Sequence, residues 1–136
     1  MAENTAIART SDFAIPEGFI CTVDISSDEG KKNVANALNA ATPLKNFMDK
    51  KITVVDILTT PGIRAVSETE CTNTYLVMKD GTVLFSQSDG VARAARTFVG
   101  LWTNVDGVCD FGDGIDVKCI EQPLNNGNTM KTLVMA

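Results

Sequence analysis

The sequence predicts a mainly β protein with two helices, in which an OB-like five-stranded Greek-key barrel follows a strand-helix N-terminal extension. The first observation is the order of elements between Ile52 and Val134, β-β-β-α-β-β, which is the order found in OB barrels. The second is Asp80-Gly81 between two apolar runs, a strong hairpin signal. The third is an amphipathic helical pattern between the third and fourth of these strands.

Length and composition indicate one globular domain. The chain has 136 residues, of which 44% are hydrophobic and 21% charged. No apolar run approaches the ~20 residues of a membrane span. We expect a loose N-terminal arm over residues 1–17, a strand-helix extension over 18–50 and the barrel over 51–136. Residues 1–16 lack the basic start and apolar core of a signal peptide, so a cytoplasmic location is expected.

The extension combines one strand with one helix. Residues 19–25 place apolar side chains at alternate positions, as a half-buried strand does. Ser26 followed by Glu29 fits a capping box and predicts the start of a helix. Pro43 ends this helix because it forces Thr42 out of the helical region. The apolar positions between these limits recur at helical spacing and are Val34, Ala37, Leu38 and Ala41.

Five segments are predicted to form the barrel strands. They share β-branched and aromatic residues bounded by turn residues, and they cover residues 51–60, 72–79, 82–86, 115–122 and 129–134. Ser88 is expected to cap the helix that follows the third strand. Asp89 is expected to pair with Arg93 across one helical turn. The apolar face of this helix consists of Val91, Ala95, Phe98, Val99 and Trp102.

The sequence lacks the side chains that many enzymes and metal sites need. It has no histidine, which removes the usual activating base for serine or cysteine and the imidazole metal ligand. Its four cysteines form no Cys-x-x-Cys pair and are expected to be reduced, buried thiols. The aspartates between residues 106 and 116 do not match a calcium-binding EF-hand loop. We therefore expect no catalytic residue, no metal, no cofactor and no enzymatic activity.

Charge is distributed unevenly along the chain. The net charge is −5, but residues 1–30 carry one base and six acids, whereas residues 31–64 carry six bases and two acids. The second segment therefore has a charge of +4 within an acidic protein. Such a segment can present a local basic surface to a polyanion, or it can be an ordinary solvated face.

Single-stranded nucleic acid is bound by a basic groove together with aromatic rings that stack on bases. In OB barrels, the first and last loops flank the binding face. Arg64 lies in the first loop of the predicted barrel, and Asn126 lies in the last. The candidate nucleic-acid-binding residues are Lys45, Phe47, Lys50, Lys51, Arg64, Tyr75, Lys79 and Asn126.

The two aromatic candidates each allow two interpretations. In its strand, Tyr75 shares a face with Val77 and Lys79. If that face points outward, the ring can stack on a base beside an ammonium group. If it points inward, Tyr75 is a core residue whose hydroxyl finds a partner. Phe47 lies among lysines and can belong to the site, or it can pack the N-terminal extension onto the barrel.

The middle of the chain resembles small single-stranded-DNA-binding replication proteins of tailed bacterial phages. The resemblance covers roughly residues 26–134 and is carried by the runs DILTTPG at 56–62, YL at 75–76, DGT at 80–82 and FSQSDGVA at 85–92. It implies an OB-like fold and sequence-tolerant binding of single-stranded DNA. It also implies that the protein protects displaced strands during phage DNA replication, in the cytoplasm of the infected host.

A second function class is a phage structural or assembly protein that self-associates through the same β-barrel. The expected partners are therefore single-stranded DNA and, in either class, a further copy of the chain. No membrane partner is expected, because no segment has the length and apolar character of a span.

Overall fold

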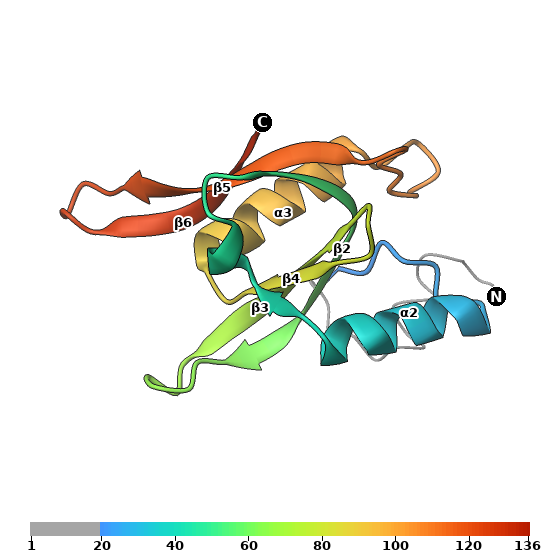
Figure 1. Ribbon diagram of the computed structural model, residues 1–136, viewed down its shortest axis with the longest axis horizontal. Coiled ribbons are helices and arrows are strands. Elements are labelled where there is room, and N and C mark those ends of the chain that lie inside the picture. The colour runs from blue at the N-terminus through green and yellow to red at the C-terminus, as the bar shows by residue number, and fades with distance from the viewer. Residues whose placement is uncertain (1–19) are drawn as a thin grey trace.

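The structure, a computed structural model, describes residues 20–136 and contains one curled, half-barrel sheet and two helices (Figure 1). The predicted arm over residues 1–17 lies outside this range. In chain order the elements are α2 (Asp28–Asn39), β1 (Thr42–Pro43), the 3₁₀ helix η1 (Leu44–Phe47), β2 (Lys51–Ile63), β3 (Glu70–Met78), β4 (Val83–Ser86), α3 (Asp89–Leu101), β5 (Ile115–Pro123) and β6 (Thr129–Met135).

Within residues 20–136, the prediction of a mainly β protein with two helices is confirmed, and β2 to β6 with α3 follow the order β-β-β-α-β-β. The sheet has six strands in the order β1-β4-β3-β2-β5-β6, instead of the five expected. The added strand is the short β1, which pairs parallel with β4. All other strand pairs are antiparallel.

β2 is the central strand and gives the sheet its curl. It has 13 residues and pairs with β5 through its first four, Lys51 to Val54, and with β3 from Val54 onward. A bulge between Val54 and Asp56 separates these two halves. Bulges bend a strand and increase its twist, so β2 can serve both halves of a curled sheet.

The prediction of a strand over residues 19–25 is wrong for residues 20–25, the part of this segment that the structure describes. Residues 20–25 contribute one isolated bridge, between Cys21 and Leu58, beside the second half of β2. Two backbone bonds hold it, from the Thr22 amide to the Ile57 carbonyl at 3.1 Å and from the Thr59 amide to the Ile20 carbonyl at 2.8 Å. The segment then turns, because the Asp24 carboxylate accepts a hydrogen bond from the Ser26 amide.

The cap of α2 lies one residue beyond the predicted Ser26. Ser27 is the N-cap, and its hydroxyl oxygen accepts a hydrogen bond from the Gly30 amide at 3.0 Å. The hydroxyl of Ser26 instead donates to the Asp24 carboxylate at 2.6 Å. Both serines can cap a helix by type, and the turn made by Asp24 decides between them.

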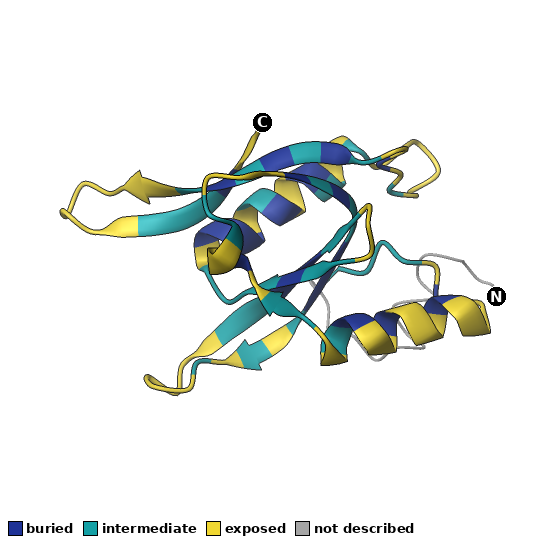
Figure 2. Cartoon of the chain, in the orientation of Figure 1, coloured by how far each residue is buried: buried dark blue, intermediate teal, exposed yellow. Residues whose placement is uncertain are grey.

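The sheet buries apolar side chains on both faces (Figure 2). The main core lies within the curl, where Phe98 and Val91 of α3 pack against strand residues such as Ile52, Leu76 and Val117. α2 covers part of the outer face with a smaller cluster, formed by Ile25, Val34, Leu58 and Tyr75. Phe98 is buried as predicted, whereas Trp102 is half-buried at the rim of the main core.

β4 and the edge strand β6 do not pair with each other and are connected by the junction between β4 and α3. The Ser88 hydroxyl donates to the Lys131 carbonyl at 2.8 Å, and the Thr132 hydroxyl donates to the Gly90 carbonyl at 3.2 Å. Ser88 is the N-cap of α3, but its hydroxyl makes no capping bond because it is used in this tie. On the same side, η1 contacts both β4 and β5 and buries Leu44 in the main core.

We expect Gly90→Ala to destabilise the protein. A Cβ atom at Gly90 would lie 2.2 Å from the Lys131 carbonyl oxygen, so α3 and β6 would have to separate. Overpacking of this kind costs about 1–3 kcal/mol. The matched control is Gly100→Ala in the same helix, where an added Cβ meets no atom within 4 Å. Gly100→Ala should gain about 0.5–1 kcal/mol from helix propensity. Equal unfolding free energies for the two variants in urea would contradict this account.

Phe98→Ala should cost about 3–5 kcal/mol, because it removes a large buried ring from the main core. Leu101→Ala is the control, since Leu101 lies three residues further along α3 with 71% of its surface exposed. That change should stay within about 0.5 kcal/mol. Urea denaturation of both variants measures the difference, and a loss below about 1 kcal/mol for Phe98→Ala would show that this face of α3 is not packed as described.

Candidate nucleic-acid interface

Four predicted site residues come together at η1 and the start of β2. Lys45 is exposed on η1, Lys50 is exposed just before β2, and Lys51 is exposed as its first residue. The Lys50 ammonium lies 5.9 Å from the centroid of the Phe47 ring, which is within cation–π range. Phe47 is half-buried against the main core, so it packs the extension onto the sheet and also supports a lysine.

Lys118 joins this group and was missed by sequence reasoning. It lies directly opposite Lys51 in the register between β2 and β5. Only the pairing of the first and fourth barrel strands brings the two lysines together, and the sequence does not show that register. We call Lys45, Lys50, Lys51 and Lys118 the lysine surface. It also carries acids, because Asp116 lies 4.0 Å from Lys51 and Asp49 precedes Lys50.

The lysine surface lies on the side of the molecule from which two hairpins project. Figure 1 shows the β2–β3 and β5–β6 hairpins extending in the same general direction, with η1 between them in that view. Asn126 is exposed in the β5–β6 turn, where its side-chain oxygen accepts a hydrogen bond from the Asn128 amide at 3.0 Å. That contact is the one expected of a turn residue.

Arg64 is the first residue of the turn that closes the β2–β3 hairpin, and it is engaged in internal contacts. Its guanidinium donates to the Asp89 carboxylate at 3.0 Å, to the Gln87 carbonyl at 3.2 Å and to the Glu70 carbonyl at 3.4 Å. Asp89 thus pairs with Arg64, and the predicted pairing with Arg93 across one turn of α3 is not the ion pair formed. Arg64 ties the hairpin to the start of α3, so we leave it out of the lysine surface.

Tyr75 is buried, with 8% of its surface exposed. It forms a cross-strand row with Leu58 of β2 and Phe85 of β4, and its ring centroid is 5.2 Å from that of Phe85. α2 covers this row, with Val34 in the same cluster. The interpretation of Tyr75 as an outward stacking ring is therefore wrong, because α2 covers the face that the ring would offer to a base.

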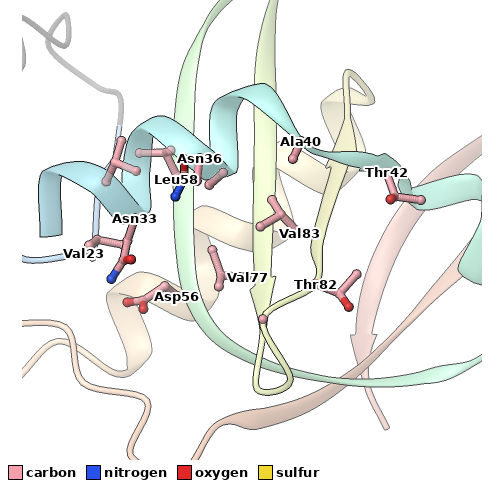
Figure 3. A pocket seen from close by; sticks show the side chains of 13 residues that line it. Val23, Asn33, Asn36, Ala40, Thr42, Asp56, Leu58, Val77, Thr82 and Val83 are labelled. Carbon is pink, nitrogen blue, oxygen red and sulfur yellow. The ribbon is translucent and has the colours of Figure 1, made fainter. Parts of the chain in front are cut away.

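A pocket of about 470 Å³ lies beside that row, between α2 and the outer face of the sheet (Figure 3). Its floor is the next cross-strand row, Asp56 of β2, Val77 of β3 and Val83 of β4. Lys79, the remaining predicted site residue, is exposed in the turn between β3 and β4, two residues from Gly81 on the pocket wall.

Asp56 is the unexpected polar group of this pocket, since the sequence places it within an apolar strand. The Thr22 hydroxyl donates to its carboxylate at 2.7 Å and accepts a hydrogen bond from the Ile57 amide at 2.9 Å. Burial raises the pKa of Asp56 above its ordinary value of 3.8, and the Thr22 hydrogen bond lowers it by less. Among residues 20–136, no group of acidic or cysteine side chains is arranged to hold a metal ion.

Comparison of the chain with protein-family models, curated proteins and solved structures gives no match. Within the described part of the chain, neither helix is long and apolar enough to cross a membrane.

Asp56→Asn should stabilise the protein at neutral pH and lose that advantage in acid. The folded state binds the Asp56 proton more tightly than the unfolded state, so stability falls as the pH rises from below 3.8 through the raised pKa. Asparagine carries no charge at any pH and removes this loss. Urea unfolding at about pH 3 and about pH 7 measures the difference.

Asp80→Asn is the control, because the pH dependence of stability that Asp80 contributes has the opposite sign to that of Asp56. Hydrogen bonding to Thr82 lowers the pKa of Asp80, so its contribution is present at neutral pH and is lost as the pH falls through the lowered pKa. Removing this carboxylate should therefore weaken the protein at about pH 7 and not at about pH 2. An Asp56→Asn effect that is the same at every pH would show that ionisation of Asp56 is not its cause.

Proposed function

We propose that this protein binds single-stranded DNA with little sequence preference. In this role it is not an enzyme but a protective protein that covers displaced strands during phage DNA replication in the host cytoplasm. The observation that carries the proposal is the lysine surface, in which three lysines between η1 and the start of β2 gather with Lys118 of β5.

The strand pairing supports the same function. β2 pairs with β3 on one side and with β5 on the other, β4 and β6 extend these pairs, and α3 connects β4 to β5. An OB-like barrel is built from such a meander and returning hairpin, and it binds oligonucleotides beside its first and last loops. Here those loops are the β2–β3 and β5–β6 turns.

Phosphate contacts supply most of the affinity in this proposal. Lysine ammonium groups neutralise phosphates without reading the bases, so binding tolerates any sequence and weakens as salt increases. Phe47 is half-buried, and its ring lies 5.9 Å from the Lys50 ammonium, which it helps to position. Tyr75 has no part in this interface, because α2 covers it.

Self-association is the second candidate, and the edge of the sheet favours it. β6 pairs with β5 alone, and beyond the contacts of Lys131 and Thr132 with the start of α3 its other edge has no strand partner among residues 20–136. Val134 and Met135 near the end of β6 are 37% and 50% exposed. An open strand edge with apolar side chains invites pairing with another copy, as an assembly protein requires. Size-exclusion chromatography with light scattering would detect it.

The double variant Lys50→Ala/Lys51→Ala should weaken binding to an oligo-dT strand. Each lost phosphate contact reduces the slope of log affinity against log salt by about 0.7, so the pair should reduce it by about 1.4. Fluorescence anisotropy across a salt series measures this slope. The charge-matched control is Lys31→Ala/Lys32→Ala on the exposed side of α2, which should leave the slope unchanged.

Two results would overturn the proposed function. One is equal slopes for the two double variants, which would mean that the lysine surface does not meet the strand. The other is no detectable binding to oligo-dT at low salt and micromolar protein. In the second case, concentration-dependent self-association would make the assembly role the leading explanation.

A further inference from the structure

We propose that the pocket between α2 and the sheet binds a nucleobase that carries an exocyclic amino group, with Asp56 and Asn33 recognising its edge. This inference rests on the proposed function where the base belongs to a bound DNA strand, and it stands alone where the ligand is a free nucleotide.

The shape of the pocket suits a flat ring. Its floor consists of side chains from neighbouring strands on one face of the sheet, including Val77 and Val83. Its roof is the side of α2 that carries Ala37 and Ala40, whose small side chains leave the space open. The volume of about 470 Å³ falls within the range of small-molecule sites. A planar base can lie between the aliphatic floor and the helix.

The polar end of the pocket requires a ligand with N–H groups. Figure 3 shows Asp56 and Asn33 at the same end, opposite Thr82. An ionised carboxylate only accepts hydrogen bonds, whereas the asparagine amide both donates and accepts. Thr22 holds the Asp56 carboxylate in place at 2.7 Å, so the acceptor is oriented before a ligand arrives.

These groups discriminate among the bases. Thymine presents one N–H between two carbonyl oxygens, and a carboxylate repels those oxygens. Cytosine, adenine and guanine each carry an amino group that can donate to Asp56, as cytosine does to acidic side chains in DNA complexes. Guanine offers its ring N–H beside its amino group, so both carboxylate oxygens can accept from it. We therefore expect guanine to bind most tightly.

The surroundings of the pocket provide access and a site for phosphate. Asn33, Asn36 and Ala40 line the pocket and are exposed, so the opening lies along α2. At the end away from Asp56, Gly81 and Thr82 form the wall beside the turn that carries Lys79. A base held at Asp56 would direct its sugar and phosphate toward this ammonium group.

Calorimetric titration of the full chain with free nucleotides tests the inference. We expect dGMP to bind, and dTMP to bind at least about tenfold more weakly, since a mismatched hydrogen-bonding edge leaves buried polar groups unpaired. Deoxyinosine monophosphate is the matched probe, because it keeps the ring N–H of guanine and lacks only the amino group. It should also bind about tenfold more weakly than dGMP. Equal affinity for dGMP and dTMP would overturn the inference.

Two variants locate the binding. Asp56→Asn keeps the size of the side chain and an oxygen for Thr22, and it should weaken dGMP binding by about tenfold or more. Ala40→Leu fills the roof of the pocket and should abolish binding. Its control, Ala35→Leu, lies on an exposed part of α2 that does not line the pocket, and it should bind dGMP normally. Circular dichroism confirms folding, and unchanged dGMP affinity in both pocket variants would place the nucleotide elsewhere.

Oligonucleotides separate failure of this inference from failure of the proposed function. Salt-sensitive binding to oligo-dT, with no dGMP binding and no effect of Asp56→Asn on oligo-dC, leaves the function standing and removes the pocket as a base site. Binding of dGMP that depends on Asp56, with no affinity for any oligonucleotide, keeps the pocket as a site for free nucleotide and removes the function. Absence of binding to both oligonucleotides and dGMP overturns both the proposed function and the inference about the pocket.

Discussion

The fold depends on the contact between the start of α3 and β6, because the sheet leaves its own edges unpaired at this point. Ser88 and Thr132 bond across the gap, and Gly90 lets the two backbones approach. Arg64 attaches the β2–β3 hairpin to the same junction through Gln87 and Asp89. Segments from three parts of the chain therefore meet within the four residues from Gln87 to Gly90.

The two covers of the sheet determine which surfaces remain for a partner. α3 fills the curl, and α2 lies over the aromatic row of Tyr75 and Phe85 on the outer face. What remains accessible is the lysine surface, the two hairpins and the pocket between α2 and the neighbouring row of the sheet. The sequence suggests that Tyr75 of β3 stacks on a base. The folded structure covers this ring and leaves the lysine surface and the pocket as the candidate binding sites.

The element order was predictable because the signals behind it are local. The β-branched run of β2, the Asp80-Gly81 turn and the apolar stripe of α3 act within a few residues, and each formed where expected. The errors involve partners distant in sequence. Tyr75 is covered by a helix some forty residues earlier, and Asp89 prefers Arg64 to its helical neighbour. Asp56 becomes a pocket residue only when α2 crosses the sheet, and no pattern in the sequence predicts that crossing.

The central position of β2 has a consequence for the order in which the chain folds. Its second half pairs with β3, which follows after a short turn, whereas Thr53 in its first half meets Asp116 across 63 residues. Closing the longer loop costs more chain entropy, so the β2–β3–β4 meander should form before β5 and β6 dock. Substitutions between β2 and β3 would then slow folding, and those between β2 and β5 would mainly speed unfolding, as stopped-flow kinetics can measure. β2 therefore both bends the sheet and determines the order in which the strands of the sheet assemble.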